Sequence, residues 1–371
     1  MNFLFLASWY PETPASRNGL FIWQHAAAMA KGEGDEVALV AAVAQPGSAK
    51  LSVAHQTIAG VQHWVASYPP GKNAISRSWR YLRALNAAVL AKEKATGKSD
   101  LFVVNVLWRA GILAWLYQLL LARPYIIIEH WSGYLPEGQG YKGFYLKYFT
   151  RLIVDRAERV LTVSSYLADS MRARGLMNRY HVLPNIVNTA VFRVAAQAEA
   201  KQPLRLLHVS NLAPEKNFDF VFQLWQDLRQ LFPELGLQVA GAYTHADKQR
   251  YAQYPDIQWL GFQEELALSK LYQSATVLCM PSFFETFSIV IAEALACGCP
   301  VLASNLATFD FYRGAKNFHP LPLDNNAAWQ ATFKEIISGN ELSNDFYFIH
   351  DNFSSAKVSK KMHSILDGIK L

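Results

Sequence analysis

Residues 276–303 read TVLCMPSFFETFSIVIAEALACGCPVLA, and this segment decides the fold. Its opening run is short and apolar, which predicts a buried strand. We expect a loop that carries Glu285, then a helix over about 287–297 that Gly298 ends, and a second strand that starts at Pro300. A strand, loop, helix and strand in this order is the repeating unit of a parallel sheet.

Two carboxylates accompany this unit. Glu285 lies where the helix begins, at the mouth of the sheet, and Glu293 lies about two turns further on. A helix N-terminus has free backbone N–H groups that suit a phosphate, so the two carboxylates could touch different parts of one elongated ligand. The simpler interpretation makes Glu285 a favourable charge at a helix start and Glu293 a solvated side chain. Spacing alone leaves both interpretations open.

The same alternation of apolar runs and amphipathic stretches continues along the whole chain, which favours two α/β domains with parallel sheets. A polar, Ala-rich segment at 192–203 is the expected linker. We expect a Rossmann-like domain at 1–192, a second at 193–355, and a final helix at 356–371 that packs back on the first. Two such domains facing across a cleft would hold a ligand at the carboxyl ends of their strands. The expected strands are 3–7, 36–42, 101–106, 125–128, 159–163, 204–209, 237–240, 257–260, 276–280 and 300–303, and the expected helices include 20–30, 144–157, 218–231 and 266–273.

Composition excludes several protein classes. With 371 residues, 51% hydrophobic and 17% charged, the chain is not a disordered polymer. Its three cysteines cannot build a disulfide framework, so buried thiols in a reducing, cytoplasmic compartment are expected. The apolar start lacks the charged region of a signal peptide and indicates a buried strand. The longest apolar stretch, 110–128, contains Gln118, Arg123 and Pro124, which favours a helix followed by a strand over a membrane span.

Charge is unevenly distributed. Residues 1–190 carry 20 Lys and Arg against 11 Asp and Glu, whereas the remainder carries 15 against 18. This pattern indicates an anionic partner for the first half, and nucleic acid, anionic lipid and a phosphorylated substrate are all compatible with it. One basic stretch, 73–94, is either a patch for anionic lipid or a lipid-linked phosphate, or a solvated helix face. Its relevant side chains are Arg77, Arg80, Arg83, Lys92 and Lys94, beside Trp79 and Tyr81.

Other sites are weakly indicated or missing. A Gly-x-Gly-x-x-Gly occurs at 138–143, but it lacks the preceding strand and the acidic residue roughly 20 positions on that a dinucleotide site needs. The spacing of Cys297 and Cys299 is too short for a zinc site, and no second pair accompanies it. The sequence also contains no Asp-x-Asp, the usual metal-clamping motif of one class of sugar transferases. We expect no metal and no cofactor.

The segment 276–303 closely resembles the signature of retaining glycosyltransferases of family 4, which have the two-domain GT-B fold. That family carries Pro-Ser-x-x-Glu-x-Phe-Gly, a second Glu eight residues after the first, and Ala-x-Gly-x-Pro-Val. The matching positions are Pro281, Ser282, Glu285, Phe287, Glu293, Gly298, Pro300 and Val301. Ser288 stands where the family usually has Gly, so the approach of the backbone to the sugar could differ there.

The resemblance implies a donor site in the second half. The stretch 207–217 looks like the family's loop whose Arg and Lys hold the donor diphosphate; Lys216 matches the Lys, whereas Asn211 replaces the Arg. By the same resemblance, Lys216 and the helix start at Phe287, Ser288 and Ile289 hold the diphosphate. Glu293 binds the ribose hydroxyls, and Glu285 contacts the sugar.

The first half shares further features with the family. The stretch 124–133 is similar to the strand that delivers the family's active-site His, which puts His130 beside the transferred sugar. A lone His at a strand end would otherwise be read as structural. Gly19 matches a glycine of the first strand–helix loop that brings backbone close to the donor phosphate. The stretch 159–192 resembles the end of the family's first domain, with Ile186 and Asn188 in place of Gly and Asp.

The resemblance therefore implies a metal-independent hexosyltransferase that moves a sugar from a nucleotide diphosphate donor with retained anomeric configuration. The expected acceptor is a glycan or a lipid-linked glycan of the cell envelope, lipopolysaccharide or an exopolysaccharide, and the expected location is cytoplasmic, with peripheral contact at the inner membrane face. Whether Glu285 forms a covalent intermediate or the acceptor attacks from the leaving-group face stays open. A non-catalytic nucleotide-sugar-binding protein and a nucleotide-sugar epimerase of GT-B shape are the alternatives. No nucleic acid partner is expected, because the basic half lacks a known binding module.

Overall fold

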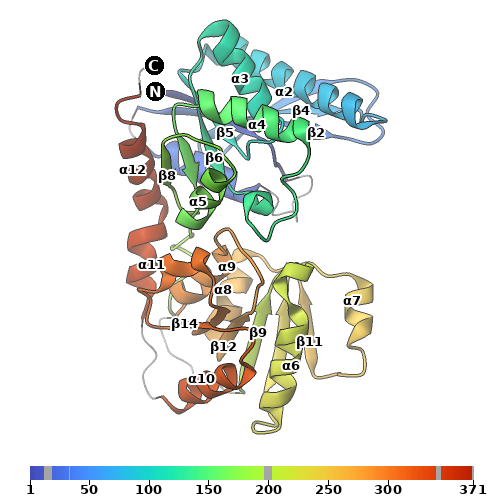
Figure 1. Ribbon diagram of the computed structural model, residues 1–371, viewed down its shortest axis with the longest axis vertical. Coiled ribbons are helices and arrows are strands. Elements are labelled where there is room, and N and C mark those ends of the chain that lie inside the picture. Colours follow the sequence, from blue (N-terminus) through green and yellow to red (C-terminus); the bar gives the residue numbers. More distant parts are fainter. Residues whose placement is uncertain (12–18, 33, 196–202, 340–343, 370–371) are drawn as a thin grey trace. The chain divides into compact units, whose positions relative to one another are not determined.

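The computed structural model describes residues 1–11, 19–32, 34–195, 203–339 and 344–369 (Figure 1). The chain divides into two compact units, 1–186 together with 355–371, and 187–354. The boundaries expected from the sequence, after residues 192 and 355, lie close to these, and residues 196–202 of the expected linker fall outside the described residues. Each unit is an α/β layer structure built on its own sheet, as the sequence predicts.

The first unit contains an eight-stranded sheet in the order β3-β4-β2-β1-β5-β6-β7-β8. All neighbours pair in parallel except β3 and β4, which form an antiparallel hairpin at one edge. The strands are β1 (Asn2–Ala7), β2 (Glu36–Ala44), β3 (Ser52–Ile58), β4 (Val61–Tyr68), β5 (Leu101–Asn105), β6 (Tyr125–Glu129), β7 (Val160–Thr162) and β8 (Tyr180–Val182).

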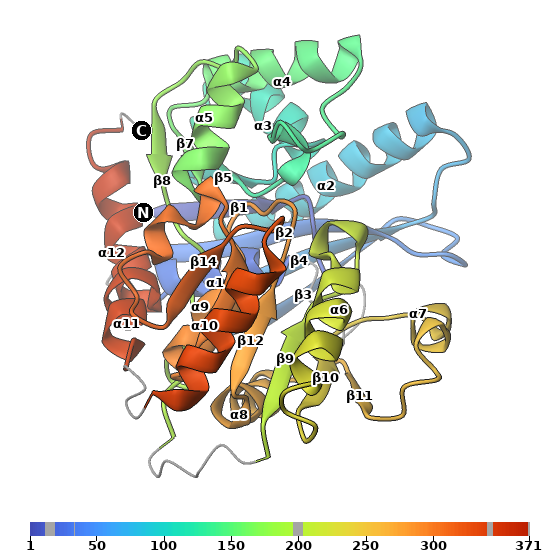
Figure 2. The ribbon, with the colours of Figure 1, turned by 60° about the horizontal axis from the view of Figure 1, so that its bottom comes forward.

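Helices cover both faces of this sheet. Alternate side chains of the central strands, such as Phe3 and Phe5, pack with α1 and α12, which contact each other. The intervening side chains face a second layer in which α2 contacts α3 and α3 contacts α4. The hairpin β3–β4 and α2 extend side by side (Figure 2). The helices are α1 (Leu20–Met29), α2 (Ala74–Thr96), α3 (Ala110–Leu121), α4 (Phe144–Arg156), α5 (Ser165–Ala173) and α12 (Ser355–Leu366), with a short 3-10 helix η1 (Ser132–Tyr134).

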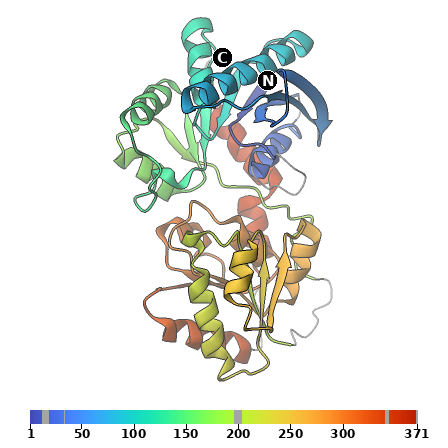
Figure 3. The same cartoon turned by 90° about the vertical axis from the view of Figure 1, so that its right-hand side faces the viewer.

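The second unit has a wholly parallel six-stranded sheet in the order β11-β10-β9-β12-β13-β14, whose yellow-to-orange strands lie side by side in Figure 3. Its core contains Trp225 and Trp329, both fully buried, on α6 and α10. The strands are β9 (Arg205–Val209), β10 (Gly236–Ala240), β11 (Ile257–Gly261), β12 (Val277–Met280), β13 (Val301–Ser304) and β14 (Phe318–Leu321). The helices are α6 (Phe218–Arg229), α7 (His245–Arg250), α8 (Glu265–Ser274), α9 (Ile289–Ala296), α10 (Asn326–Ser338) and α11 (Phe346–Phe353), with η2 (Pro214–Lys216) and η3 (Ala307–Tyr312).

Each sheet has one point at which the strand order reverses. In the second unit the chain runs outward from β9 to β10 and later from β12 to β13, so the reversal lies between β9 and β12. In the first unit it lies between β1 and β5. Loops diverge from the carboxyl ends of the strands at such a point, which makes it the usual ligand site of an open α/β sheet.

Two expectations about the elements are wrong. The sequence reading omitted β3, β4, β8 and β14, which are short or lie near a sheet edge and lack a continuous apolar run. It also started the helix of the signature segment at Phe287, whereas α9 begins at Ile289. Phe287 is not helical because its ring is buried against Phe311, with the ring centres 5.0 Å apart. Gly298 ends the helix as predicted, in the left-handed conformation (φ 73°).

Candidate active site

A cation and a carboxylate meet at the strand-order reversal of the second unit. Lys216 lies on the loop after β9, and Glu285 on the loop after β12, the neighbouring strand. Lys216 Nζ donates to Glu285 Oε1 at 2.6 Å, and Ser282 Oγ donates to the same oxygen at 3.1 Å. The side chains are 21% and 10% exposed, so the pair is largely removed from water yet still accessible.

The loop between Glu285 and α9 is fixed by hydrogen bonds to its backbone. Thr308 Oγ1 donates to the carbonyl of Thr286 at 2.9 Å, and the buried Tyr312 hydroxyl donates to that of Ser288 at 3.0 Å. Ser288 itself has φ 62° and ψ 80°, a strained conformation for a residue with a side chain. Glycine would adopt this conformation without strain, which explains why the family that the sequence resembles usually has glycine at this position.

The N-terminus of α9 follows directly. No side chain of the described residues caps this helix, so the N–H groups of Ile289 and Val290 are available to a ligand, whereas that of Ile291 donates to the carbonyl of Ser288 at 3.2 Å. Ile289 supplies the first of them, two residues later than expected, and Ser288 is the N-cap. Phe287 contributes a buried ring to the aromatic cluster with Phe311, Tyr312 and Phe353. Burial raises the pKa of Tyr312 well above its usual value, and Glu285 and Glu293 add to the effect.

Glu293 is not a solvated side chain. It is only 3% exposed, and Tyr272 of α8 donates its hydroxyl to Glu293 Oε2 at 3.0 Å. This contact orients the carboxylate, and a buried carboxylate is costly unless its oxygens are hydrogen-bonded. The interpretation of Glu293 as a surface charge is therefore wrong, whereas a ligand-binding role fits its fixed orientation.

The loop after β9 is built around a neutral histidine. His208 is fully buried, with Nδ1 2.8 Å from the carbonyl of Cys279 and Nε2 2.7 Å from Ser210 Oγ. Burial lowers the pKa of His208 to about 4. Asn211, the residue in place of the family's Arg, is exposed and accepts a 3.3 Å hydrogen bond from the N–H of Ala213. It therefore stabilises its own turn and supplies no cation.

The three cysteines are buried thiols, as expected.

In the first unit, Gly19 begins α1 with φ 78°. A Cβ atom there would lie 2.3 Å from the carbonyl oxygen of Trp9, so only glycine allows this helix start to approach the end of β1 so closely. Nearby, Ser8 Oγ lies 2.5 and 2.7 Å from the carbonyl oxygens of Val106 and Trp108, which share its single hydroxyl hydrogen. These bonds join the loops after β1 and β5 at the strand-order reversal of this sheet.

His130 follows the last residue of β6. It is 7% exposed, and its ring lies 3.9 Å from that of Phe21, measured between centres. Neither ring nitrogen has a hydrogen-bond partner among the described residues. Burial lowers the pKa of His130 well below its usual value, with His25 as a second cause. A buried imidazole whose two nitrogens have no partner among the described residues is a candidate to hydrogen-bond a ligand.

Glu129 holds the backbone around His130, and the sequence analysis missed it. Its Oε1 accepts the N–H groups of His130 and Trp131, each at 2.9 Å, and its Oε2 accepts that of Leu107 at 3.0 Å. Burial raises the pKa of Glu129, and these three N–H groups oppose the rise. The contact to Leu107 fixes a strained loop, because Val106 has φ 58° although it is β-branched.

The glycine-rich motif at 138–143 is structural. Trp131 packs its ring over this loop, and a Cβ atom at Gly133 or Gly140 would lie 2.3 or 2.4 Å from that ring.

Only part of the basic stretch 73–94 lies on the surface. Tyr81 is buried, and the buried Lys92 donates to Ser99 Oγ at 2.8 Å, so neither can belong to a patch. Arg77, Arg83 and Lys94 are exposed.

The described residues contain no group of three or more His, Cys, Asp or Glu that could hold a metal ion. None of their helices combines the length and hydropathy needed to cross a bilayer.

Comparison with known proteins identifies the family. The model for "Glycosyl transferase 4-like domain" matches residues 21–186, and the model for "Glycosyl transferases group 1" matches residues 193–346. The two matches adjoin and together span most of the chain. They fall on the segments that contain His130 in the first unit and Lys216, Glu285 and Glu293 in the second.

Individual relatives include glycosyltransferases, but each sequence alignment covers less of this chain than the two family models do together. A D-inositol 3-phosphate glycosyltransferase of Segniliparus rotundus is 23% identical over 223 residues, 54% of this chain and 49% of the relative. An O-antigen chain mannosyltransferase B of Escherichia coli is 30% identical over 112 residues, 28% of this chain and 29% of the relative. The chain thus aligns with less than half of either relative. A sucrose-phosphate synthase of Thermosynechococcus elongatus shares the fold, with a TM-score of 0.77, 15% identity and 98% of both chains covered. The chain is therefore a glycosyltransferase of the GT-B fold.

Proposed function

We propose that this glycosyltransferase moves a hexose-type sugar from a nucleotide diphosphate donor with retention of configuration. One observation carries the proposal: an ammonium, a carboxylate and an uncapped helix N-terminus converge at the strand-order reversal of the second unit. The ammonium and the N–H groups suit a diphosphate, and the carboxylate suits sugar hydroxyls.

In this proposal the second unit binds the donor. Lys216 and the N–H groups at Ser288 and Ile289 hold the diphosphate and stabilise the charge that develops as it leaves. Glu293 accepts hydrogen bonds from two neighbouring ribose hydroxyls, in an orientation supported by its contact with Tyr272. Asn211 lacks the charge of the family's Arg, so Lys216 is the main cation for the phosphates. A metal is not needed for this chemistry, because Lys216 and the helix supply the positive charge.

Glu285 and His130 complete the proposed chemistry. Glu285 contacts the transferred sugar. His130, a neutral imidazole with both nitrogens unpartnered among the described residues, contacts the sugar near its anomeric carbon. Retention follows either from a covalent intermediate on Glu285 or from attack on the leaving-group face. Gly19 allows backbone close to the donor phosphate in the same scheme, because a side chain there would collide with the carbonyl oxygen of Trp9.

The proposed acceptor is a glycan or lipid-linked glycan of the cell envelope, bound by the first unit, in a cytoplasmic enzyme with peripheral contact to the membrane. The relative named as an O-antigen chain mannosyltransferase supports the envelope role. The outer face of α2 supports the membrane contact, because Ile75, Trp79 and Leu90 are 83%, 59% and 53% exposed beside Arg83. Exposed apolar side chains flanked by cations are typical of interfacial helices.

A thermal-shift screen tests the donor. UDP-, GDP-, ADP- and dTDP-sugars and their parent diphosphates are added without metal and again with a chelator. A donor at a hundred times its dissociation constant adds about 2.7 kcal/mol to the free energy of unfolding, so one nucleotide family should raise the melting temperature. Product analysis then follows, with and without acceptor. A new glycoside with the anomeric configuration of the donor supports transfer. An epimerised donor or binding without turnover would replace the proposal by one of its two alternatives.

A further inference from the structure

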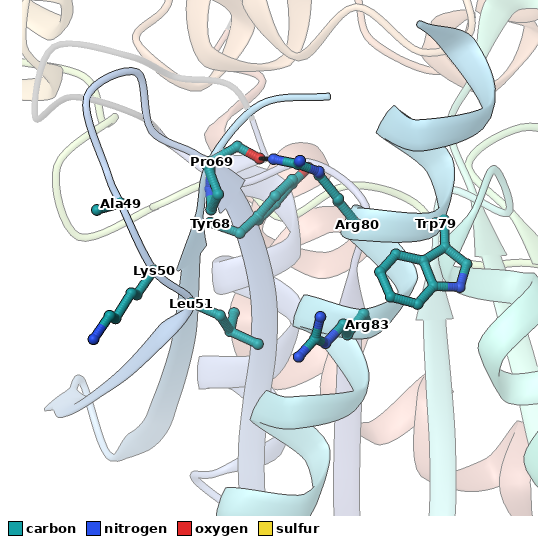
Figure 4. A pocket seen from close by; sticks show the side chains of 8 residues that line it. All are labelled: Ala49, Lys50, Leu51, Tyr68, Pro69, Trp79, Arg80 and Arg83. Carbon is teal, nitrogen blue, oxygen red and sulfur yellow. Dashed lines mark hydrogen bonds between the residues drawn. The ribbon is translucent and has the colours of Figure 1, made fainter. Parts of the chain in front are cut away.

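A cavity of about 540 Å³ lies in the first unit between the base of the β3–β4 hairpin and the first half of α2. One wall is formed by the chain before β3, at Lys50 and Leu51, and by the end of β4 at Tyr68 and Pro69. The opposite wall consists of Trp79, Arg80 and Arg83 of α2 (Figure 4). None of the residues that we have assigned to the donor or to the transferred sugar lines it.

Positively charged side chains line the cavity, and the surrounding sequence contains no acidic residue. Lys50, Arg80 and Arg83 line it, and no acidic residue does so among the described residues. Residues 37–92, which supply most of β2, all of β3 and β4 and most of α2, contain six Lys and Arg and no Asp or Glu. A surface that served solubility alone would mix both signs. The uniform sign concentrates anions at this edge of the sheet.

The two arginines are held in place before any ligand arrives. Arg80 Nη1 donates to the carbonyls of Pro69 and Pro70, at 3.2 and 3.3 Å, and the first of these bonds is drawn in Figure 4. Both bonds engage Nη1 of this cavity-lining side chain, so Nη2 and Nε are the nitrogens that we expect a ligand to use. Arg83 lies over the ring of Trp79, 5.4 Å from its centre. Fixed guanidinium groups suit phosphoryl oxygens, which accept two parallel hydrogen bonds from one arginine.

The cavity lies at the end of the sheet where a substrate is expected. β4 pairs in parallel with β2, and β2 with β1, so β4 ends at the same edge as β1. Neighbouring strands are about 4.8 Å apart, so the cavity lies roughly 10 Å along this edge from the end of β1. This separation from the strand-order reversal suits an anchor for one end of an extended acceptor rather than its reacting hydroxyl.

We propose that this cavity binds a phosphoryl group of the acceptor, with Arg80 and Arg83 as its main contacts, Lys50 as a third cation and Trp79 against the attached sugar. The inference rests on the proposed function in one respect, the identity of the ligand as the acceptor. It narrows the acceptor to a phosphorylated sugar, either free or as the head of a lipid.

Calorimetric titration tests the inference on the full chain. Glucose 6-phosphate and glucose are compared as soluble probes, and vesicles of equimolar phosphatidic acid and phosphatidylcholine are compared with vesicles of phosphatidylcholine alone. The double variant R80Q/R83Q removes the two arginines. The double variant K31Q/K98Q removes two exposed charges of the same unit that neither line the cavity nor belong to the basic stretch 73–94, and it serves as the matched control.

The phosphorylated probe should bind at least about tenfold more tightly than its neutral counterpart, and only R80Q/R83Q should remove this difference. If glucose 6-phosphate shows it, the ligand is a free phosphosugar; if only the acidic vesicles show it, the phosphoryl group is carried by a lipid. Equal losses in both double variants, or no preference for phosphate in either pair of probes, would overturn the inference. A donor melting shift measured on the same samples tests the proposed function separately, because the residues assigned to the donor are unchanged.

Discussion

Lys216 Nζ and Glu285 Oε1 lie 2.6 Å apart, although 69 residues separate them in the chain. The contact exists because β9 and β12 are neighbours and both loops leave the sheet at the same edge. A donor diphosphate would compete with Glu285 for this ammonium. The pair thus couples the proposed phosphate contact to the proposed sugar contact, and substituting each partner should have a different effect.

Replacing Lys216 by Ala should weaken donor binding. A hydrogen bond to a charged group contributes about 1.5–3 kcal/mol, so the dissociation constant of the donor should rise roughly ten- to a hundredfold. Lys334→Ala, which removes an exposed lysine of α10, is the control. Titration of both variants with the nucleotide diphosphate found in the thermal-shift screen measures the effect. Unchanged affinity in Lys216→Ala would exclude it from the phosphate site.

Replacing Glu285 by Gln should separate binding from turnover. The neutral amide no longer competes for the ammonium of Lys216, so the donor should bind as tightly as in the wild type or more tightly. Turnover should fall by roughly a hundredfold or more, because a charge at the transferred sugar acts mainly in the transition state. Steady-state kinetics and donor titration together test this. A variant that retains wild-type turnover would remove Glu285 from the chemistry.

Glu293→Gln should weaken binding of ribonucleotides in particular. A neutral amide offers one acceptor oxygen in place of two charged ones, so it accepts hydrogen bonds from the ribose hydroxyls more weakly than a carboxylate does. We expect an affinity loss of about tenfold for a ribonucleoside diphosphate and a smaller loss for its 2′-deoxy counterpart. Tyr272→Phe, which removes the hydroxyl that orients Glu293, should show a milder form of the same pattern. Equal losses for both nucleotides would point to a general packing defect.

Ser288→Gly should stabilise the protein. Left-handed backbone costs a residue with a side chain roughly 1–2 kcal/mol, and the greater freedom of glycine in the unfolded chain returns about 0.5–1 kcal/mol of this. The net gain should be roughly 0.5–1 kcal/mol, visible as a higher melting temperature of the second unit. Ala at the same position keeps the Cβ atom and should give no gain, which makes it the control. A less stable Gly variant would contradict the strain at Ser288.

The sequence predicts the parts of this protein whose signal is local. The strand–loop–helix segment around Glu285, the end of α9 at Gly298 and the α/β class all follow from short runs of residues. Phe287 is outside the helix because an aromatic cluster from η3 and α11 holds its ring, and no local pattern records such a contact. Glu129 was missed for the same reason, since its partner Leu107 is 22 residues away. A carboxylate within an otherwise apolar strand was the available signal.

Acid should destabilise both units, through buried histidines that stay neutral in the folded state, among them His25 in the first unit and His208 in the second. Burial lowers the pKa of His25 in the first unit and of His208 in the second to about 4, whereas an unfolded chain has a value of 6.5. At a pH between these two pKa values the histidine is protonated in the unfolded state but neutral in the folded state. The free energy of unfolding therefore falls as the pH falls from 6.5 toward 4. Each histidine contributes at most about 1.4 kcal/mol per pH unit.

Thermal melting at pH 7, 6, 5 and 4 measures this dependence, at values chosen to span the titration window of about 6.5 to 4. His208→Gln removes the titrating ring in the second unit, and His25→Gln does so in the first. Each variant should flatten the pH dependence of its own unit while lowering its melting temperature at pH 7, because the buried hydrogen bonds are lost. A pH dependence as steep in the variants as in the wild type would show that other groups control acid unfolding.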